Sequence, residues 1–100
     1  MVSSNISSIE TLDELQRFVY RTLCNDHELL LNDFPTSEKI LRKPNGHSCG
    51  MMFCLYGPRK TELTAIWEKD QNRVLFYGVN GQRYQQIHLD DCHITDVELH

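Results

Sequence analysis

Apolar residues recur at helical spacing near the start of the chain. The stripe consists of Leu12, Leu15, Val19 and Leu23, and polar or charged residues fill most of the remaining circumference. Thr11 is suited to the N-cap, and Glu14 three residues later completes a capping box. The pattern predicts an amphipathic helix over residues 12–24. Its apolar stripe must be buried against the part of the chain that follows.

Strand-like alternation of apolar and polar residues follows this helix. Runs typical of strands cover residues 48–56, 61–68, 73–79 and 82–89, and a shorter run covers 37–43. Short polar turns separate them, while Pro35 limits any extension of the helix through the connector. The spacing predicts an α+β fold, in which the N-terminal helix packs on a four- to five-stranded antiparallel β-meander.

The dipeptide Asn80-Gly81 predicts the register of the last hairpin, because a type I′ turn requires positive φ at both central residues. A two-residue loop at this dipeptide would pair Val79 with Gln82, Tyr77 with Tyr84, and Val74 with Ile87. A four-residue loop at 69–72 would pair Trp67 with Val74. Directly opposed residues share one face of a sheet, so these pairs divide the strand residues into two faces.

One predicted face is plainly apolar. It collects Leu63, Ala65, Trp67, Val74, Phe76, Ile87 and Leu89, and we expect the helix to cover it. A plain turn at 57–60 would exclude Met51, Phe53 and Leu55 from that face, whereas a bulge near Gly57 would return them to it. We favour the bulge, because leaving three large apolar side chains in water costs about 25 cal/mol per Å² of apolar area.

The second predicted face is amphipathic rather than polar. It collects Thr64, Ile66, Leu75, Tyr77, Tyr84, Gln86 and His88. An antiparallel sheet covered on one side usually shows a cleaner polar alternation on the other. Either the sheet curls toward a partial barrel, or this face binds a partner. We predict a partner-binding face formed by Ile66, Leu75, Tyr77, Tyr84 and His88, which serves protein interaction or self-association as a homodimer.

Length and composition are those of a small folded domain. One hundred residues suit a single domain over residues 1–100, and we expect flexible ends at 1–10 and 90–100. The N-terminus lacks the pattern of a secretory signal, and no apolar run approaches membrane-spanning length. The sequence therefore predicts a cytoplasmic protein with reduced cysteines and no membrane partner.

Chemical motifs are weak. Cysteines at 24, 49, 54 and 92 and five histidines could supply zinc ligands or a Cys–His catalytic pair, but no paired C-x-x-C spacing occurs. The glycines are scattered at turns and strand positions and form no phosphate-binding loop. The sequence predicts no cofactor and no metal, and it favours a small non-enzymatic binding or regulatory module over an enzyme.

Single-stranded nucleic acid is the alternative ligand. Tyr77 and Tyr84 side by side, with Arg73 at the edge of the same face, would offer a base-stacking platform. A formal charge of −4 argues against phosphate-backbone binding, which depends on clustered positive charge. Paired tyrosines also stabilise hairpins without any ligand. Protein interaction is therefore the favoured reading of this face.

Overall fold

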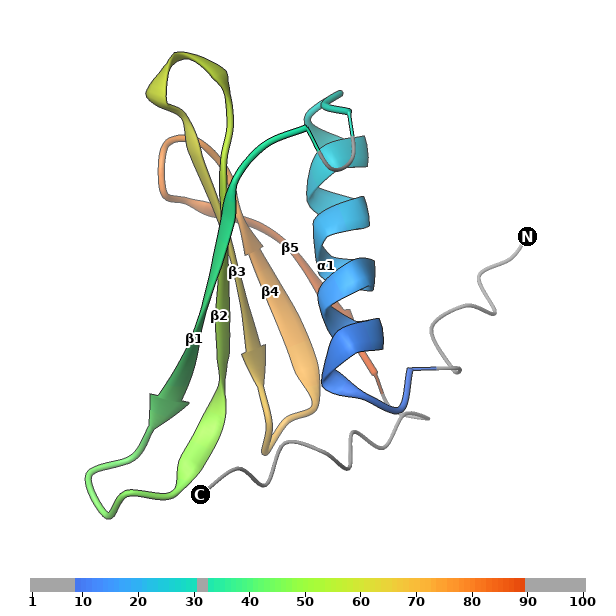
Figure 1. Ribbon diagram of the computed structural model, residues 1–100. Coiled ribbons are helices and arrows are strands. Elements are labelled where there is room, and N and C mark those ends of the chain that lie inside the picture. Colours follow the sequence, from blue (N-terminus) through green and yellow to red (C-terminus); the bar gives the residue numbers. More distant parts are fainter. Residues whose placement is uncertain (1–8, 31–32, 90–100) are drawn as a thin grey trace.

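The computed structural model describes residues 9–30 and 33–89 and contains one helix and five strands (Figure 1). The elements in chain order are α1 (Leu12–Asp26), β1 (Thr36–Arg42), β2 (Ser48–Tyr56), β3 (Glu62–Glu68), β4 (Arg73–Tyr77) and β5 (Arg83–His88). A short 3₁₀ turn, η2 (Pro58–Lys60), joins β2 to β3. The predicted helix and all five predicted strands are present, with ends shifted by one or two residues.

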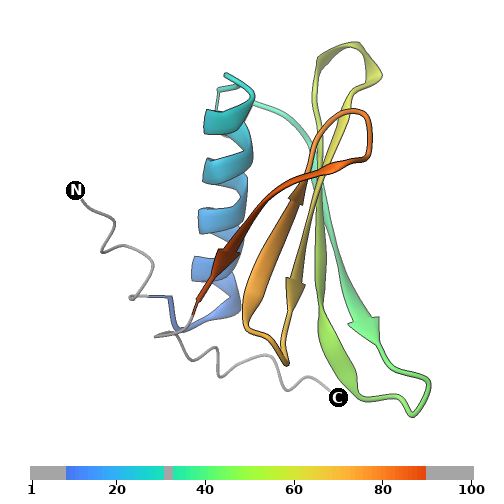
Figure 2. The same ribbon diagram turned by 180° about the vertical axis from the view of Figure 1, so that it is seen from behind.

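The five strands form one antiparallel sheet in the order β1-β2-β3-β4-β5, so each strand pairs with its neighbour in sequence. Helix α1 lies against one face of this sheet, as both views show (Figures 1 and 2). The predicted α+β fold with a helix on an antiparallel meander is confirmed. The sheet twists but is not closed, because β1 and β5 do not pair with each other.

The start of α1 follows the capping prediction with one change. The Thr11 hydroxyl accepts a hydrogen bond from the Glu14 backbone N–H (3.1 Å), as an N-cap requires. The Glu14 carboxylate, however, accepts from the N–H of Glu10 (2.7 Å) rather than from that of Thr11. Ile9, which was expected within a flexible end, is only 3% exposed and belongs to the core. The predicted ends at 1–8 and 90–100 lie outside the described residues.

The end of α1 is a Schellman motif. The N–H of Leu29 donates to the carbonyl of Cys24 (2.8 Å), and the N–H of Glu28 points to the carbonyl of Asn25 (3.5 Å). Glu28 has φ 57, in the left-handed region that this motif requires. The chain therefore turns away from the helix at this residue.

The core lies between α1 and the sheet. The strands supply Met51, Phe53, Leu55, Leu63, Ala65, Trp67, Val74 and Phe76, and we call the face that carries them the helix-covered face. Met51, Phe53 and Leu55 lie on this face, as predicted. The cause is η2 rather than a bulge near Gly57: Arg59 and Lys60 adopt left-handed φ values of 60 and 63. The resulting turn pairs Tyr56 with Glu62.

The Asn72 side chain links Trp67 to Leu89 at the end of the core near the β3–β4 turn. The predicted pairing of Trp67 with Val74 is confirmed, and the turn before β4 places Asn72 beside the indole ring. The Trp67 indole N–H donates to the Asn72 side-chain oxygen (3.0 Å), and the Asn72 amide donates to the carbonyl of Leu89 (2.6 Å). The indole N–H is thus satisfied inside the core.

The predicted register of the last hairpin is confirmed along most of β5, where Val74 pairs with Ile87, and it is wrong only next to the turn. The Gly81 N–H donates to the Gly78 carbonyl (2.9 Å), so Val79 and Asn80 are the central residues of the turn. Gly81 has φ 79 but Asn80 does not have positive φ, so this is not the predicted type I′ turn. A bulge between Phe76 and Tyr77 then restores the predicted register, from Phe76 opposite Gln85 to Arg73 opposite His88. Tyr77 consequently pairs with Arg83 and not with Tyr84.

Candidate functional site

The face of the sheet opposite α1 is uncovered by any element in the described residues (Figures 1 and 2). We call it the open face. The strand register places Ser37, Lys39, Met52, Cys54, Thr64, Ile66, Leu75 and Tyr77 on it. Successive side chains of a strand point to opposite faces of the sheet. Each of these residues is therefore adjacent in sequence to residues of the helix-covered face.

A row of apolar side chains crosses the centre of the open face. Met52, Ile66 and Leu75 lie side by side on β2, β3 and β4, since Met52 pairs with Ile66 and Ile66 with Leu75. Met52 and Ile66 are half-buried, and Leu75 is only 4% exposed. In the next row, Cys54 is 6% exposed and its thiol lies 4.0 Å from the Thr64 hydroxyl. The centre of this face is therefore apolar and well packed.

Polar groups border this apolar row. The Arg73 guanidinium forms an ion pair with Glu68 (2.5 Å) on one side. The hydroxyls of Tyr56 and Ser37 are hydrogen-bonded (3.0 Å) on the other. Such an arrangement, an apolar centre with a polar rim, is typical of interaction surfaces.

The structure brings together three of the five predicted site residues. Ile66 and Leu75 are direct cross-strand partners, and Tyr77 lies in the adjacent row opposite Thr64. His88 is on the same face at the β5 edge, opposite Arg73, where its ring contacts the Gln86 amide (3.2 Å). Tyr84, the fifth predicted site residue, does not lie on the open face.

Tyr84 is on the helix-covered side because of the bulge in the last hairpin. Its hydroxyl donates to Asp26 (2.7 Å) near the end of α1, and its ring meets His27 edge-on with centroids 5.5 Å apart. Partial burial and the neighbouring Asp26 carboxylate raise the pKa of the Tyr84 phenol. Gln85, opposite Phe76 in the regular ladder, lies on the same side, and its amide donates to the same carboxylate (3.1 Å). The predicted Tyr77–Tyr84 platform, on which nucleic-acid stacking depended, is not formed.

Sequence reasoning missed Met52 and Cys54 as members of the open face. The signal was present, because β2 is apolar at consecutive positions rather than at alternate ones. A continuous apolar run is typical of a strand whose two faces are both shielded from water.

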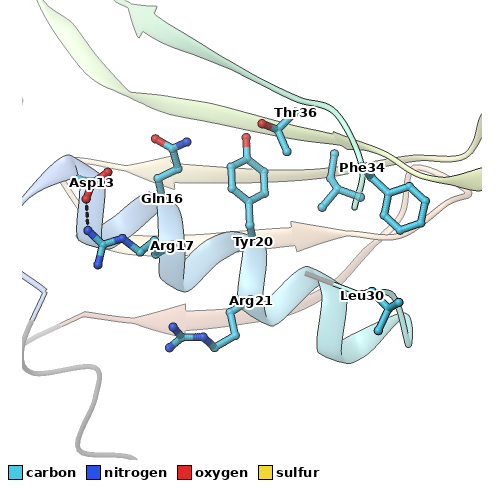
Figure 3. Close-up of a pocket in the computed structure, with 9 residues that line it drawn as sticks. Asp13, Gln16, Arg17, Tyr20, Arg21, Leu30, Phe34 and Thr36 are labelled. Carbon is cyan, nitrogen blue, oxygen red and sulfur yellow. Dashed lines mark hydrogen bonds and ion pairs between the residues drawn. The ribbon is translucent and has the colours of Figure 1, made fainter. Parts of the chain in front are cut away.

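A cavity of about 320 Å³ lies between α1 and the start of β1 (Figure 3). Its lining residues are Asp13, Gln16, Arg17, Tyr20, Arg21, Leu30, Phe34, Thr36 and Leu55. The Tyr20 hydroxyl donates to the Glu38 carboxylate (2.6 Å), and burial together with this acceptor raises the pKa of the phenol. At one end of the cavity Arg17 is paired with Asp13, as Figure 3 shows.

The candidate metal ligands and nucleophiles are dispersed in the described part of the chain. Within residues 9–30 and 33–89, no three His, Cys, Asp or Glu side chains form a group that could hold a metal ion. Cys24, Cys49 and Cys54 are free thiols, and burial raises the pKa of Cys24. None of these three is hydrogen-bonded to a described histidine. The predicted Cys92-His93 pair lies outside the described residues.

Comparison of the chain with models of protein families, with curated proteins and with solved structures found no match. No helix in the described residues is both long and apolar enough to span a membrane.

Proposed function

We propose that this chain is a non-enzymatic protein-interaction module that self-associates through its open face. The observation that supports the proposal is the apolar row of Met52, Ile66 and Leu75 on a face that no described element covers. Two sheets that pack face to face bury such rows against each other about 10 Å apart. A second copy of the chain supplies a matching surface.

The order of residues in the row favours a two-fold symmetric dimer. Ile66 lies on the central strand β3, with Met52 and Leu75 on either side of it. A two-fold axis through Ile66 and parallel to the strands would place Met52 against Leu75 of the second copy. Isologous contacts of this kind are the commonest form of homo-oligomer.

The neighbouring row is compatible with the same axis. It would place Cys54 against Tyr77 of the second copy and Thr64 against Thr64, which brings no like charges together at the centre. In the row on the other side of Ile66, Gly50 would lie opposite Arg73, and Glu68 would lie opposite Glu68 of the second copy. This like-charge contact is unfavourable, and the Arg73 guanidinium that each Glu68 carboxylate pairs with offsets it. The cytoplasmic location expected from the sequence remains a prediction, and it fits a face that contains the thiol of Cys54.

Sedimentation equilibrium of the reduced protein over a wide concentration range tests this proposal. We expect a monomer–dimer equilibrium that the double variant Ile66→Thr/Tyr77→Ser shifts toward monomer by at least about tenfold, because it removes apolar area from the interface. Val79→Ser is the matched control: Val79 is 62% exposed in the last turn, outside the open face, and its loss should leave the equilibrium unchanged.

A wild-type protein that stays monomeric at every concentration would contradict self-association. A dimer that the double variant leaves intact would place the interface on another surface. Circular dichroism and thermal unfolding of both variants establish that the fold is retained, since both open-face positions are only half-buried.

A further inference from the structure

We propose that the outer edge of β1 binds an extended segment of a partner protein, which adds a strand to the sheet and places one apolar side chain in the cavity between α1 and β1. This site is separate from the open face. It combines two features that peptide-binding sheet edges use: free main-chain groups for affinity and a pocket for specificity.

The first feature is the orientation of the β1 backbone. The carbonyl of Pro35 accepts a hydrogen bond from the Tyr56 N–H (2.9 Å), which makes these residues a hydrogen-bonded pair. Hydrogen-bonded and non-hydrogen-bonded pairs alternate along an antiparallel ladder. Thr36, Glu38 and Ile40 are in the non-hydrogen-bonded pairs with β2, so their backbone N–H and C=O groups point away from β2. No described element lies beside this edge in either view (Figures 1 and 2).

The second feature is the cavity at the start of the same strand. Thr36 lines it together with the apolar side chains of Leu30, Phe34 and Leu55, and the Tyr20 ring projects from α1 between helix and strand (Figure 3). A residue opposite Thr36 in an added strand would direct its side chain to the same face as Thr36. The volume of about 320 Å³ has room for a large aliphatic or aromatic side chain.

Charges at the edge indicate which strand would fit. Antiparallel pairing of β1 with β1 of a second copy has two registers that would pair most of the strand, one centred on Glu38 and one on Lys39. The first places Glu38 opposite Glu38 and the second places Lys39 opposite Lys39, and like charges directly opposite one another are unfavourable. A second copy is therefore disfavoured at this edge. A partner with an acidic residue opposite Lys39 is favoured, because the Lys39 side chain is exposed on the open face.

The predicted recognition element follows from antiparallel pairing. An acidic residue opposite Lys39 comes three positions before the residue opposite Thr36, which must be apolar. The core of the element is thus Asp-x-x-Leu in an extended conformation. The bulge between Leu41 and Arg42 ends the regular edge, so only the first part of β1 takes part.

Fluorescence anisotropy with a fluorescein-labelled, acetylated Asp-Thr-Thr-Leu-Thr peptide tests the proposal. We expect saturable binding to the wild-type chain, weakened at least about tenfold when the peptide leucine is replaced by serine. Thr36→Pro should weaken binding at least about fivefold, because it removes an outward N–H without touching the ladder to β2. Leu30→Ser, at a position that is 71% exposed, should weaken binding by removing a wall of the cavity.

Two control variants separate this site from the others. Val79→Ser matches Leu30→Ser in exposure but lies outside the cavity, and it should bind the peptide as the wild type does. The open-face variant Ile66→Thr/Tyr77→Ser should also bind normally. If that variant loses the peptide while Thr36→Pro keeps it, the peptide binds the open face and the β1 site is wrong.

Three other results would overturn the proposal. The first is the absence of saturable binding to the folded wild-type chain. The second is equal binding by wild type, Thr36→Pro and Leu30→Ser. The third is tighter binding of a peptide that copies Thr36–Arg42 than of the acidic probe, which would make a second copy of β1 the occupant.

Discussion

The two faces of the sheet are built from alternate residues of the same strands, yet they differ in what covers them. On the helix-covered face, Phe53, Ala65, Val74 and Phe76 are buried beneath α1. On the open face, Met52 and Ile66 are only half-buried, and strand neighbours alone shield them. The first face stabilises the fold, while the second carries apolar area that the described fold does not use. Exposed apolar patches of the second kind commonly mark interaction sites, which is the basis of the proposed self-association.

Adjacent residues on β3 offer the strongest test of this difference. Trp67→Ala on the helix-covered face should lower the free energy of unfolding by about 3–5 kcal/mol, because it removes a fully buried aromatic ring. Ile66→Ala on the open face should lower it by only about 1 kcal/mol, since this side chain is only half-buried. Urea unfolding of both variants measures the contrast. Equal losses would mean that the open face is as much a part of the core as the other.

Substitution of Asn72 tests whether the core near the β3–β4 turn depends on a polar side chain. Asn72→Ala should lower the free energy of unfolding by about 2 kcal/mol, because it leaves the Trp67 indole N–H and the Leu89 carbonyl without their amide partner. The substitution also places alanine at a φ of 48. Thermal unfolding measures the loss. Asn72→Gly is the control. Glycine adopts a positive φ without strain, so this variant should be more stable than Asn72→Ala.

The sequence predicted the architecture well because its signals are local. The stripe from Leu12 to Leu23 and the alternation in β3 each require one kind of element. The face of Tyr84 could not be predicted in this way, because Asn80-Gly81 is compatible with more than one hairpin turn. Contacts of Tyr84 with Asp26 and His27, which are distant in sequence, accompany the bulge that displaces it from the predicted position. The cavity beside β1 also depends on such contacts, since its walls come from α1, the connector and β2.

Tyr20 links α1 to the β1 edge and gives the helix-covered face a dependence on pH. Tyr20→Phe should lower the free energy of unfolding by about 1–2 kcal/mol at neutral pH, because the hydroxyl donates to Glu38 and lies 3.1 Å from the Ser37 carbonyl. Burial raises the pKa of this phenol above its ordinary value of 10.0. The folded state therefore keeps the proton after the unfolded chain has released it.

The sign of the pH effect follows from this difference. The contribution of Tyr20 is fully present below the unfolded pKa of 10.0 and is lost as the pH rises above it. Urea unfolding between about pH 8 and about pH 11 should show the wild type losing more stability than Tyr20→Phe, so that the two curves converge. Curves that stay parallel would show that the phenol ionises equally in both states.

Gly81 provides the test with the smallest expected effect, because the last turn and the adjacent bulge decide which face Tyr84 joins. Gly81→Ala should lower the free energy of unfolding by about 1 kcal/mol, since alanine disfavours the φ of 79 although no atom lies within 4 Å of the added methyl group. Gly78→Ala is the matched control within the same turn. Its methyl group would meet neighbours at ordinary distances of 3.8–3.9 Å, without a positive φ, so we expect little change. If Gly81→Ala were as mild as this control, the turn would have an alternative register that moves Tyr84 toward the open face, and an amide-exchange comparison of Tyr77 and Arg83 would detect it.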